Sequence, residues 1–374
     1  MKIFFCDNSL KSLVGFRGEV IKHFLSQGHD ITLVAPIIND EDNSAIVPDG
    51  CKLHQLHMEP SSINPLKDLF LFGLYLKFFL KECPQIVFNY TIKPNIYACL
   101  AAKMCGAYVV DTLTGLGYTF NGNGMAKSLG RMMYRIGLHF ADKVFMLNEA
   151  NRQVILDSGF VDEKKIVLLE GGEGVDLIRF AMKEETFDTS IRFLMIARVL
   201  YDKGYLEFVE AARIIKQKYK NVEFEILGSV NPASPMGVQL DTLVNDVASG
   251  RIKYLGYTND VPYYIARDGV VVVLPSYHEG MNCSLMEGCA MGRPIIATNI
   301  PGCREMVDDG ENGFLCNPMD SESLASAMKK FLDLPETRKR EMSGKSRIKA
   351  EERFDVRKVF KYYEREIESA LTCR

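Results

Sequence analysis

The stretch Val270–Thr298, VVVVLPSYHEGMNCSLMEGCAMGRPIIAT, decides the fold class of this chain. It begins with a β-branched apolar run, continues through a polar loop that carries Glu279, and enters a helical stretch near Ser284. A second apolar run, Ile295–Ala297, follows. A buried strand, a helix and another buried strand in this order form a βαβ unit. Such a unit requires a parallel sheet covered by helices.

The same alternation continues along the chain, interrupted by a Gly-rich joint at 171–174. Because 374 residues exceed the size at which one core stops growing, two domains are expected. We predict an α/β fold of two doubly wound, Rossmann-like domains facing a cleft, with ligands bound at the carboxyl ends of the strands. One domain would span 1–175 and include the C-terminal helix 356–374, and the other would span 176–355. The first helix is expected at Glu19–Gln27. The other predicted strands are Ile3–Cys6, Ile31–Ala35, Ile86–Asn89, Tyr108–Asp111, Val144–Leu147, Ile166–Leu169, Phe193–Ala197, Val222–Leu227 and Lys253–Leu255.

Composition excludes several classes of protein. A hydrophobic content of 47% and a charged content of 25% are typical of a globular chain and not of a disordered or fibrous one. The net charge of −3 gives no reason to expect a nucleic-acid partner. The ten cysteines form no Cys-x-x-Cys pair, and no secretory signal or membrane-spanning apolar run is evident. We therefore expect a cytoplasmic protein with reduced thiols.

Two carboxylates in the opening stretch point to a nucleotide-sugar site. Glu279 lies on a loop at a strand's carboxyl end, and Glu287 lies about one turn into the next helix. The amino end of that helix suits a diphosphate, and Gly280 lets the backbone approach a ligand closely. One carboxylate could bind sugar hydroxyls and the other ribose hydroxyls. A second interpretation stays open, because Ser284 and Glu287 also form a Ser-x-x-Glu capping box.

With these residues and several further motifs, the chain resembles the retaining, two-domain glycosyltransferases of family 4, which have a GT-B fold and a Glu-x7-Glu signature. The resemblance spans the whole chain and is closest to the branch that extends undecaprenyl-diphosphate-linked glycans. The motifs are Ala197-Arg198, Asp202-Lys203-Gly204, Leu227-Gly228, Tyr254-Leu255-Gly256, Asp260-Val261, Leu274-Pro275-Ser276-Tyr277, Glu279-Gly280, Pro301-Gly302-Cys303-Arg304-Glu305 and Asn312-Gly313-Phe314-Leu315.

The resemblance implies a set of donor-site roles. Arg198, Lys203 and Glu279 would be catalytic, the two cations holding the diphosphate in place of a metal. No metal or other cofactor is therefore expected. Many relatives have Pro-Arg or Phe-Gly where this chain has Asn282-Cys283, so donor choice could depend on that pair. The residues expected to bind the donor are Gly15, Gly228, Tyr257, Gly280, Met281, Asn282, Cys283, Ser284, Leu285 and Glu287.

The acceptor is expected in the N-terminal domain. Ser12–Gly18 follows the first strand and resembles the family's glycine loop, in which the Gly15 amide would meet the donor's distal phosphate. Relatives often carry a histidine near the loop after Tyr108–Asp111, and this chain has none there, so a histidine base is not expected. The acceptor-binding candidates are Phe16, Arg17, Lys93, Asn95 and Thr114.

Two basic, amphipathic stretches suggest contact with a membrane. Residues 60–140 carry eight Lys or Arg and three Asp or Glu. Residues 65–81 combine five aromatic side chains with three lysines, and 125–139 place Lys127, Arg131 and Arg135 on one helical face. Such stretches suit the surface of an anionic leaflet. They also suit core helices whose lysines reach the solvent. We expect peripheral attachment to the inner face of the cytoplasmic membrane.

The sequence therefore predicts a retaining, metal-independent hexosyltransferase. It would move a hexose or N-acetylhexosamine, best GalNAc, from a UDP-sugar to an undecaprenyl-diphosphate-linked glycan of O-antigen, capsule or related type. Two alternatives stay open: a UDP-sugar 2-epimerase on the same fold, and a nucleotide-sugar-binding protein without catalysis. A dehydrogenase is disfavoured, because no Gly-x-Gly-x-x-Gly follows the first strand.

Overall fold

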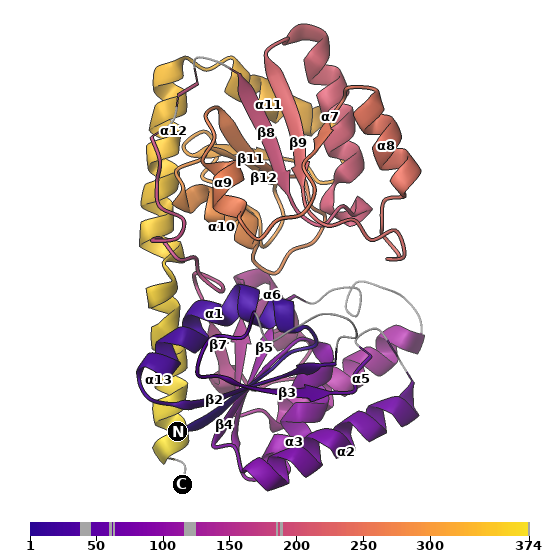
Figure 1. Ribbon diagram of the computed structural model, residues 1–374, viewed down its shortest axis with the longest axis vertical. Helices are drawn as coiled ribbons and strands as arrows, with labels where there is room; N and C mark the ends of the chain where they lie inside the picture. Colours follow the sequence, from indigo (N-terminus) through magenta and orange to yellow (C-terminus); the bar gives the residue numbers. More distant parts are fainter. Residues whose placement is uncertain are drawn as a thin grey trace. The chain divides into compact units, whose positions relative to one another are not determined.

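The computed structural model describes residues 1–37, 46–59, 62, 64–115, 125–184, 186–187 and 190–372, without the side chains of 125–129. The chain divides into two compact units (Figure 1). Unit 1 comprises Met1–Glu173 and Val356–Arg374, and unit 2 comprises Gly174–Asp355. The first boundary therefore lies two residues before the position expected from the sequence.

Among the described residues, unit 1 contains a seven-stranded parallel sheet in the order β3-β2-β1-β4-β5-β6-β7. Ile3 of the first strand pairs with Ile31 on one side and with Ile86 on the other. The strand order therefore reverses between β1 and β4, as in a doubly wound fold. The strands are β1 (Lys2–Cys6), β2 (Asp30–Pro36), β3 (Lys52–Leu56), β4 (Ile86–Tyr90), β5 (Tyr108–Leu113), β6 (Lys143–Met146) and β7 (Ile166–Leu168).

Helices cover both faces of this sheet. Successive side chains of a strand point to opposite faces, so a strand can pack against helices on both sides. Phe4 and Cys6 join the core beneath α2, α3 and α5, which lie together in Figure 1. Phe5 and Phe88 stack on the other face, where Tyr363 of α13 contacts Phe88. The helices are α1 (Leu10–Ser26), α2 (Pro65–Glu82), α3 (Cys99–Met104), α5 (Met125–Phe140), α6 (Glu149–Asp157) and α13 (Val356–Thr372), with short turns η2 (Pro94–Ala98) and η3 (Glu163–Lys165).

The first helix begins nine residues earlier than expected. Ser9 is its N-cap and accepts a hydrogen bond from the Ser12 amide. Gly15 therefore lies inside α1, where a main-chain amide bonds to the carbonyl four residues before it. The prediction that 12–18 forms a glycine loop, with the Gly15 amide presented to a phosphate, is wrong. Leu10 and Leu13 are buried, and this burial extends the helix through the glycine.

Unit 2 repeats the same winding. Its described residues form a six-stranded parallel sheet in the order β10-β9-β8-β11-β12-β13, which reverses between β8 and β11. The strands are β8 (Ile191–Ile196), β9 (Val222–Leu227), β10 (Lys253–Tyr254), β11 (Val270–Leu274), β12 (Ile295–Thr298) and β13 (Gly313–Cys316). The helices are α7 (Tyr205–Lys218), α8 (Leu240–Ala248), α9 (Val261–Ile265), α10 (Cys283–Ala290), α11 (Ser321–Leu332) and α12 (Glu336–Lys349), with short turns η4 (Tyr201–Lys203), η5 (Arg304–Met306) and η6 (Ala350–Phe354).

Two edge strands, β3 and β13, were not predicted as strands. The sequence of β3, Lys52–Leu56, carries lysine, histidine and glutamine among its five residues, so it lacks a long apolar run. Strand β13 begins at Gly313, whose backbone packs so closely on β12 that a Cβ would lie 1.8 Å from the Ile295 carbonyl oxygen. Both strands are defined by pairing with a neighbour rather than by their own composition.

Candidate active site

Three side chains predicted to be catalytic follow strands that border the reversal in unit 2. Ligands of doubly wound sheets bind outside the carboxyl ends of the strands at such a reversal. The segment after β8 carries Arg198 and Lys203, and the segment after β11 carries Glu279. Lys203 Nζ lies 2.7 Å from Glu279 Oε1, and both side chains are largely shielded, with 15% and 10% exposed. Arg198 is exposed to solvent.

Main-chain contacts join these two segments. The Tyr277 amide donates to the Asp202 carbonyl over 2.9 Å, and the Tyr277 hydroxyl donates to Glu207 Oε1 over 2.8 Å. Gly204 has a φ of +82°, and a Cβ there would lie 2.1 Å from the Pro275 carbonyl oxygen. Only glycine allows this approach, so Gly204 supports the Lys203–Glu279 pair. Gly204 belongs to the motif Asp202-Lys203-Gly204, but its role depends on a contact with a segment distant in sequence and could not be predicted.

Helix α10 begins beside Glu279. Asn282 is its N-cap, and its Oδ1 accepts a hydrogen bond from the Leu285 amide over 2.9 Å. The capping-box interpretation of Ser284 and Glu287 is therefore wrong, because Ser284 lies inside the helix. Glu287 falls in the second turn, too far along the helix to belong to a capping box at its amino end. The Asn282 amide donates to the Gly302 carbonyl over 3.0 Å, so that main-chain donor is already used within the protein.

The first residues of α10 lie against a second close-packed glycine. A Cβ on Gly302, which has a φ of +82°, would lie 2.7 Å from the Gly280 carbonyl oxygen. Met281 and Leu285 are buried, whereas Cys283 and Ser284 are half-buried at the amino end of the helix. The amino end of α10 thus sits beside Glu279, and its partial positive charge suits an anionic group. Gly302 therefore allows the close contact with the loop that carries Glu279, a role that its sequence motif alone does not predict.

Glu287 has an unusual electrostatic environment. Desolvation by burial raises its pKa to about 7, and the charge of Arg179 opposes this shift. Arg179, which sequence analysis missed, also donates from Nη2 to the Asn259 carbonyl over 2.9 Å. The hydroxyl of Tyr257 donates to Asn259 Oδ1 over 2.8 Å, and its side chain is exposed. Glu287 and Tyr257 are therefore both connected to the segment around Asn259.

Gly228 directly follows β9 and packs against the segment after β8. Its amide donates to the Gly256 carbonyl over 2.8 Å. A Cβ at this position would lie 1.8 Å from the Ala197 carbonyl oxygen, which adjoins Arg198. The glycine therefore lets the segments after β8 and β9 meet directly. The donor residues predicted from unit 2 thus lie on one edge of one sheet.

The strand reversal in unit 1 contains a buried charge cluster. Arg17 is 2% exposed, with Nη2 2.5 Å from Glu173 Oε1 and Nη1 3.6 Å from Asp7 Oδ2. Its guanidinium also lies 4.1 Å from the centre of the Tyr90 ring. Burial raises the pKa of Asp7 to about 6, although Arg17 opposes the shift. These contacts give Arg17 a structural role, and its binding to an acceptor stays a prediction.

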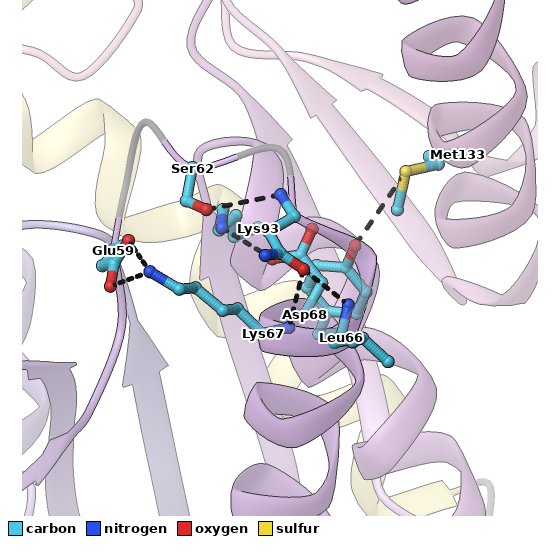
Figure 2. A network of polar contacts seen from close by, with 9 residues as sticks. Glu59, Ser62, Leu66, Lys67, Asp68, Lys93 and Met133 are labelled. Carbon is cyan, nitrogen blue, oxygen red and sulfur yellow. Dashed lines mark hydrogen bonds and ion pairs between the residues drawn. The ribbon is translucent and has the colours of Figure 1, made fainter.

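The other acceptor candidates are distributed near the same edge. Lys93 is buried, and its Nζ lies 2.6 Å from Asp68 Oδ1, within the network drawn in Figure 2. Asn95 is buried and donates from Nδ2 to the Thr112 carbonyl over 2.9 Å. Thr114 is half-buried just beyond β5, and Phe16 on α1 is exposed. Lys93 and Asn95 already have protein partners, and acceptor binding by any of the four stays a prediction.

Comparisons with known proteins agree with this arrangement. Residues 17–172 match the family described as "Glycosyl transferase 4-like domain", and 178–346 match "Glycosyl transferases group 1". Together the two matches cover most of both units. The chain belongs to the GT-B glycosyltransferases.

Several relatives of this glycosyltransferase are informative. It is 27% identical over 353 residues to the N,N'-diacetylbacillosaminyl-diphospho-undecaprenol alpha-1,3-N-acetylgalactosaminyltransferase of Campylobacter jejuni, covering 89% of this chain and 90% of the relative. It is 27% identical to the UDP-Gal:alpha-D-GlcNAc-diphosphoundecaprenol alpha-1,3-galactosyltransferase of Escherichia coli, covering 79% and 76%. The crystal structure of Anabaena HepE in complex with UDP-glucose shares the fold, with a TM-score of 0.81 at 17% identity over 99% and 100% of the chains.

The two stretches expected to contact a membrane form helices in the glycosyltransferase. On α2, Leu66, Leu69, Phe70 and Leu80 are all at least 60% exposed, and the side chains of Lys67 and Lys81 are 53% and 80% exposed. On α5, the exposed apolar residues Met132, Ile136 and Phe140 repeat at four-residue steps, and Arg135 is exposed. The side chain of Lys127 lies outside the described residues. Within the part of the chain that the structure describes, no helix is long and apolar enough to cross a bilayer.

The metal prediction is not tested by the glycosyltransferase structure. No group of three or more His, Cys, Asp or Glu side chains that could hold a metal ion occurs among the described residues. The sequence contains one Asp-x-Asp tripeptide, Asp40-Glu41-Asp42, and it lies outside them. That the enzyme works without a metal therefore stays a prediction.

Proposed function

We propose that this glycosyltransferase moves a hexose or N-acetylhexosamine, with GalNAc the first choice, from a UDP-sugar to a saccharide on undecaprenyl diphosphate. The transfer would retain the anomeric configuration and would serve the synthesis of O-antigen, capsule or a related glycan. The names of the two relatives support the lipid-linked acceptor. The observation that carries the proposal is the Lys203–Glu279 pair beside the amino end of α10, at the strand reversal of unit 2.

The proposed chemistry is electrostatic. Lys203 has three N–H donors, so it can bind a phosphate oxygen while keeping Glu279 in place. Arg198 is exposed and offers a planar fork of donors to the diphosphate. Together with the amino end of α10, these cations would stabilise the negative charge that develops on UDP as the sugar leaves. Glu279 would hold sugar hydroxyls and Glu287 the ribose hydroxyls.

No protein base is required in this scheme. The departing phosphate oxygen would accept the proton of the acceptor hydroxyl on the same face of the sugar. Transfer on one face retains the configuration at the anomeric carbon. The absence of a histidine from Thr112–Gly115, at the end of β5 and just beyond it, is consistent with this route. Product stereochemistry, measured by NMR of the anomeric proton coupling, tests it directly.

A donor screen tests the proposed function. The purified enzyme would be incubated with a panel of UDP-sugars and a short undecaprenyl-diphosphate-saccharide, and UDP release and glycolipid mass would be recorded. We expect one UDP-sugar, UDP-GalNAc first, to extend the glycolipid by one sugar. The Lys203→Ala variant serves as the inactive control. Epimer formation without an acceptor would identify an epimerase. Tight UDP-sugar binding without turnover would identify a binding protein.

We also propose that α2 and α5 attach the enzyme to an anionic membrane surface. Their exposed apolar residues would enter the headgroup region, and nearby lysines and arginines would face anionic lipids. Replacing Lys127, Arg131 and Arg135 by glutamate should abolish co-sedimentation with vesicles containing phosphatidylglycerol. Co-sedimentation equal to that of the unmodified protein would exclude attachment through α5.

A further inference from the structure

A cavity of about 250 Å³ opens at the start of α2 in unit 1. The surface inside it is mostly apolar, and its apolar residues come from two parts of the chain: Met58 follows β3, whereas Leu66, Phe70 and Leu71 lie on α2. The polar residues that line it are His57, Glu59, Lys67, Asp68 and Lys93. Met58 and Leu71 are 7% and 2% exposed and form the deep part of the wall. The polar network drawn in Figure 2 includes Lys67, Asp68 and Lys93, which also line this cavity.

The cavity is continuous with an exposed apolar surface. Leu66 and Phe70, which line it, are 76% and 60% exposed and stand one helical turn apart. Leu69, between them in sequence, is 66% exposed but does not line the cavity. Apolar side chains held in solvent beside an apolar cavity favour an apolar ligand that covers both. A chain that enters the cavity would therefore pass over Leu66 and Phe70.

Two cations line the same cavity, each paired with a carboxylate that also lines it, and the two cations differ in their freedom to change partners. Lys93 is buried and paired with Asp68 over 2.6 Å, and breaking a buried pair is costly. Lys67 is 53% exposed and lies 2.6 Å from Glu59, which is 46% exposed. An exposed pair contributes little to stability, so Lys67 can exchange Glu59 for another anion. The cavity thus combines an apolar interior with one available ammonium group.

We propose that this cavity receives the isoprene units next to the diphosphate of the lipid-linked acceptor, with Lys67 binding the diphosphate. The inference rests on the proposed function, from which the lipid diphosphate comes. The cavity is smaller than the roughly 300–1,000 Å³ of pockets that enclose a whole drug-sized ligand, so it holds only one end of a long chain. The rest of the isoprenoid stays in the membrane beside α2.

Binding measurements without membranes test the cavity itself. Geranyl diphosphate and methyl diphosphate would be titrated into the full chain by calorimetry. We expect geranyl diphosphate to bind roughly tenfold more tightly, the equivalent of burying about two CH2 groups. Leu66→Ser and Phe70→Ser should remove this preference. Leu69→Ser and Leu80→Ser are matched controls on the same helix, equally exposed but outside the cavity, and should keep it.

Several results would overturn the inference. Equal affinity for the two diphosphates would show that the cavity does not take an isoprenoid. An equal loss of preference in the control variants would show that the whole apolar surface, and not the cavity, binds the chain. A methionine-methyl NMR spectrum adds an independent readout, because geranyl diphosphate should shift the Met58 signal and methyl diphosphate should not. Binding that leaves Met58 unchanged would place the ligand elsewhere.

Turnover then separates this inference from the proposed function. The acceptor saccharide would be supplied on a methyl or a geranyl diphosphate. A tenfold lower KM for the geranyl form, lost in Leu66→Ser and kept in Leu69→Ser, would support both. Turnover with equal KM values would overturn the cavity assignment and leave the transferase function intact. Geranyl-selective binding without turnover on either acceptor would support the cavity assignment and contradict the proposed transferase function. Lys67→Gln should weaken both diphosphates by a similar factor.

Discussion

Donor binding should depend on pH through Glu287, because burial raises the pKa of this carboxyl group to about 7. In the proposed function, ribose hydroxyls donate their hydrogen bonds to the ionised carboxylate, so the protonated enzyme should bind the donor weakly. With a pKa near 7, about one-tenth of the carboxyl groups are ionised at pH 6 and about nine-tenths at pH 8. The dissociation constant of the UDP-sugar should therefore fall roughly tenfold between these pH values.

The assay is calorimetric titration at pH 6, 7 and 8 and constant ionic strength. The intact UDP-sugar is the ligand of choice, because the terminal phosphate of free UDP itself titrates near pH 6. Glu287→Gln should bind the donor more weakly at pH 8 and should show no slope with pH. Asp7→Asn is the control, since burial raises the pKa of Asp7 to about 6 and it could mimic the effect. A slope that persists in Glu287→Gln and vanishes in Asp7→Asn would refute the assignment.

The raised pKa of Glu287 also predicts how the stability of the folded protein changes with pH. The ordinary pKa of Glu287 is 4.5, so the folded ligand-free protein holds a proton that the unfolded chain releases between about pH 4.5 and 7. Stability should fall as pH rises through this window. Glu287→Gln removes the burial penalty, which is at most about 3 kcal/mol at pH 8 and below about 1 kcal/mol at pH 5. An equal stabilisation at both pH values would contradict desolvation as the cause.

Three further substitutions test other parts of the structure. Lys203→Ala should lower kcat/KM by roughly 10²–10³-fold, since losing one donor to a developing anion costs about 3–4 kcal/mol; near-normal steady-state rates would exclude this role. Arg17→Met should lower the free energy of unfolding in urea by about 3–5 kcal/mol, because it leaves Asp7 and Glu173 buried without their cation; a loss below about 1 kcal/mol would mean that water replaces it. Asp111→Asn should stabilise the protein more at pH 8 than at pH 5, because burial raises the pKa of Asp111 well above its ordinary value; melting shifts that match at both pH values would contradict this.

The shared location of the donor candidates could be predicted because their spacing is local in sequence. Glu279 and Glu287 lie within one loop and one helix, and the β-branched run before them identifies the strand end that holds the loop. Arg198 and Lys203 follow another apolar run in the same way. Since parallel strands end at a common edge, residues that follow several strands are brought close together.

The partners of these residues could not be predicted, because they depend on contacts between distant segments. Ser284 and Glu287 match the capping-box pattern, yet Asn282 caps the helix, and only the backbone geometry distinguishes the two. Gly15 fits a loop pattern, but burial of the leucines around it extends the helix. The sequence predicts that Arg17 binds a ligand, but in the structure its side chain pairs with Glu173, which lies 156 residues away along the chain.

The sequence by itself therefore determined the class of fold and the positions of most strands along the chain, and it selected the candidates for nucleotide-sugar binding. These follow from periodicity and from motifs within single βα units, where the spacing of residues controls their positions. Only the tertiary structure decided which charges are paired, which glycines are required by close packing, and where an apolar cavity opens beside α2. Burial and pairing are properties of the space between segments, and the distance between two residues along the chain does not determine their separation in that space.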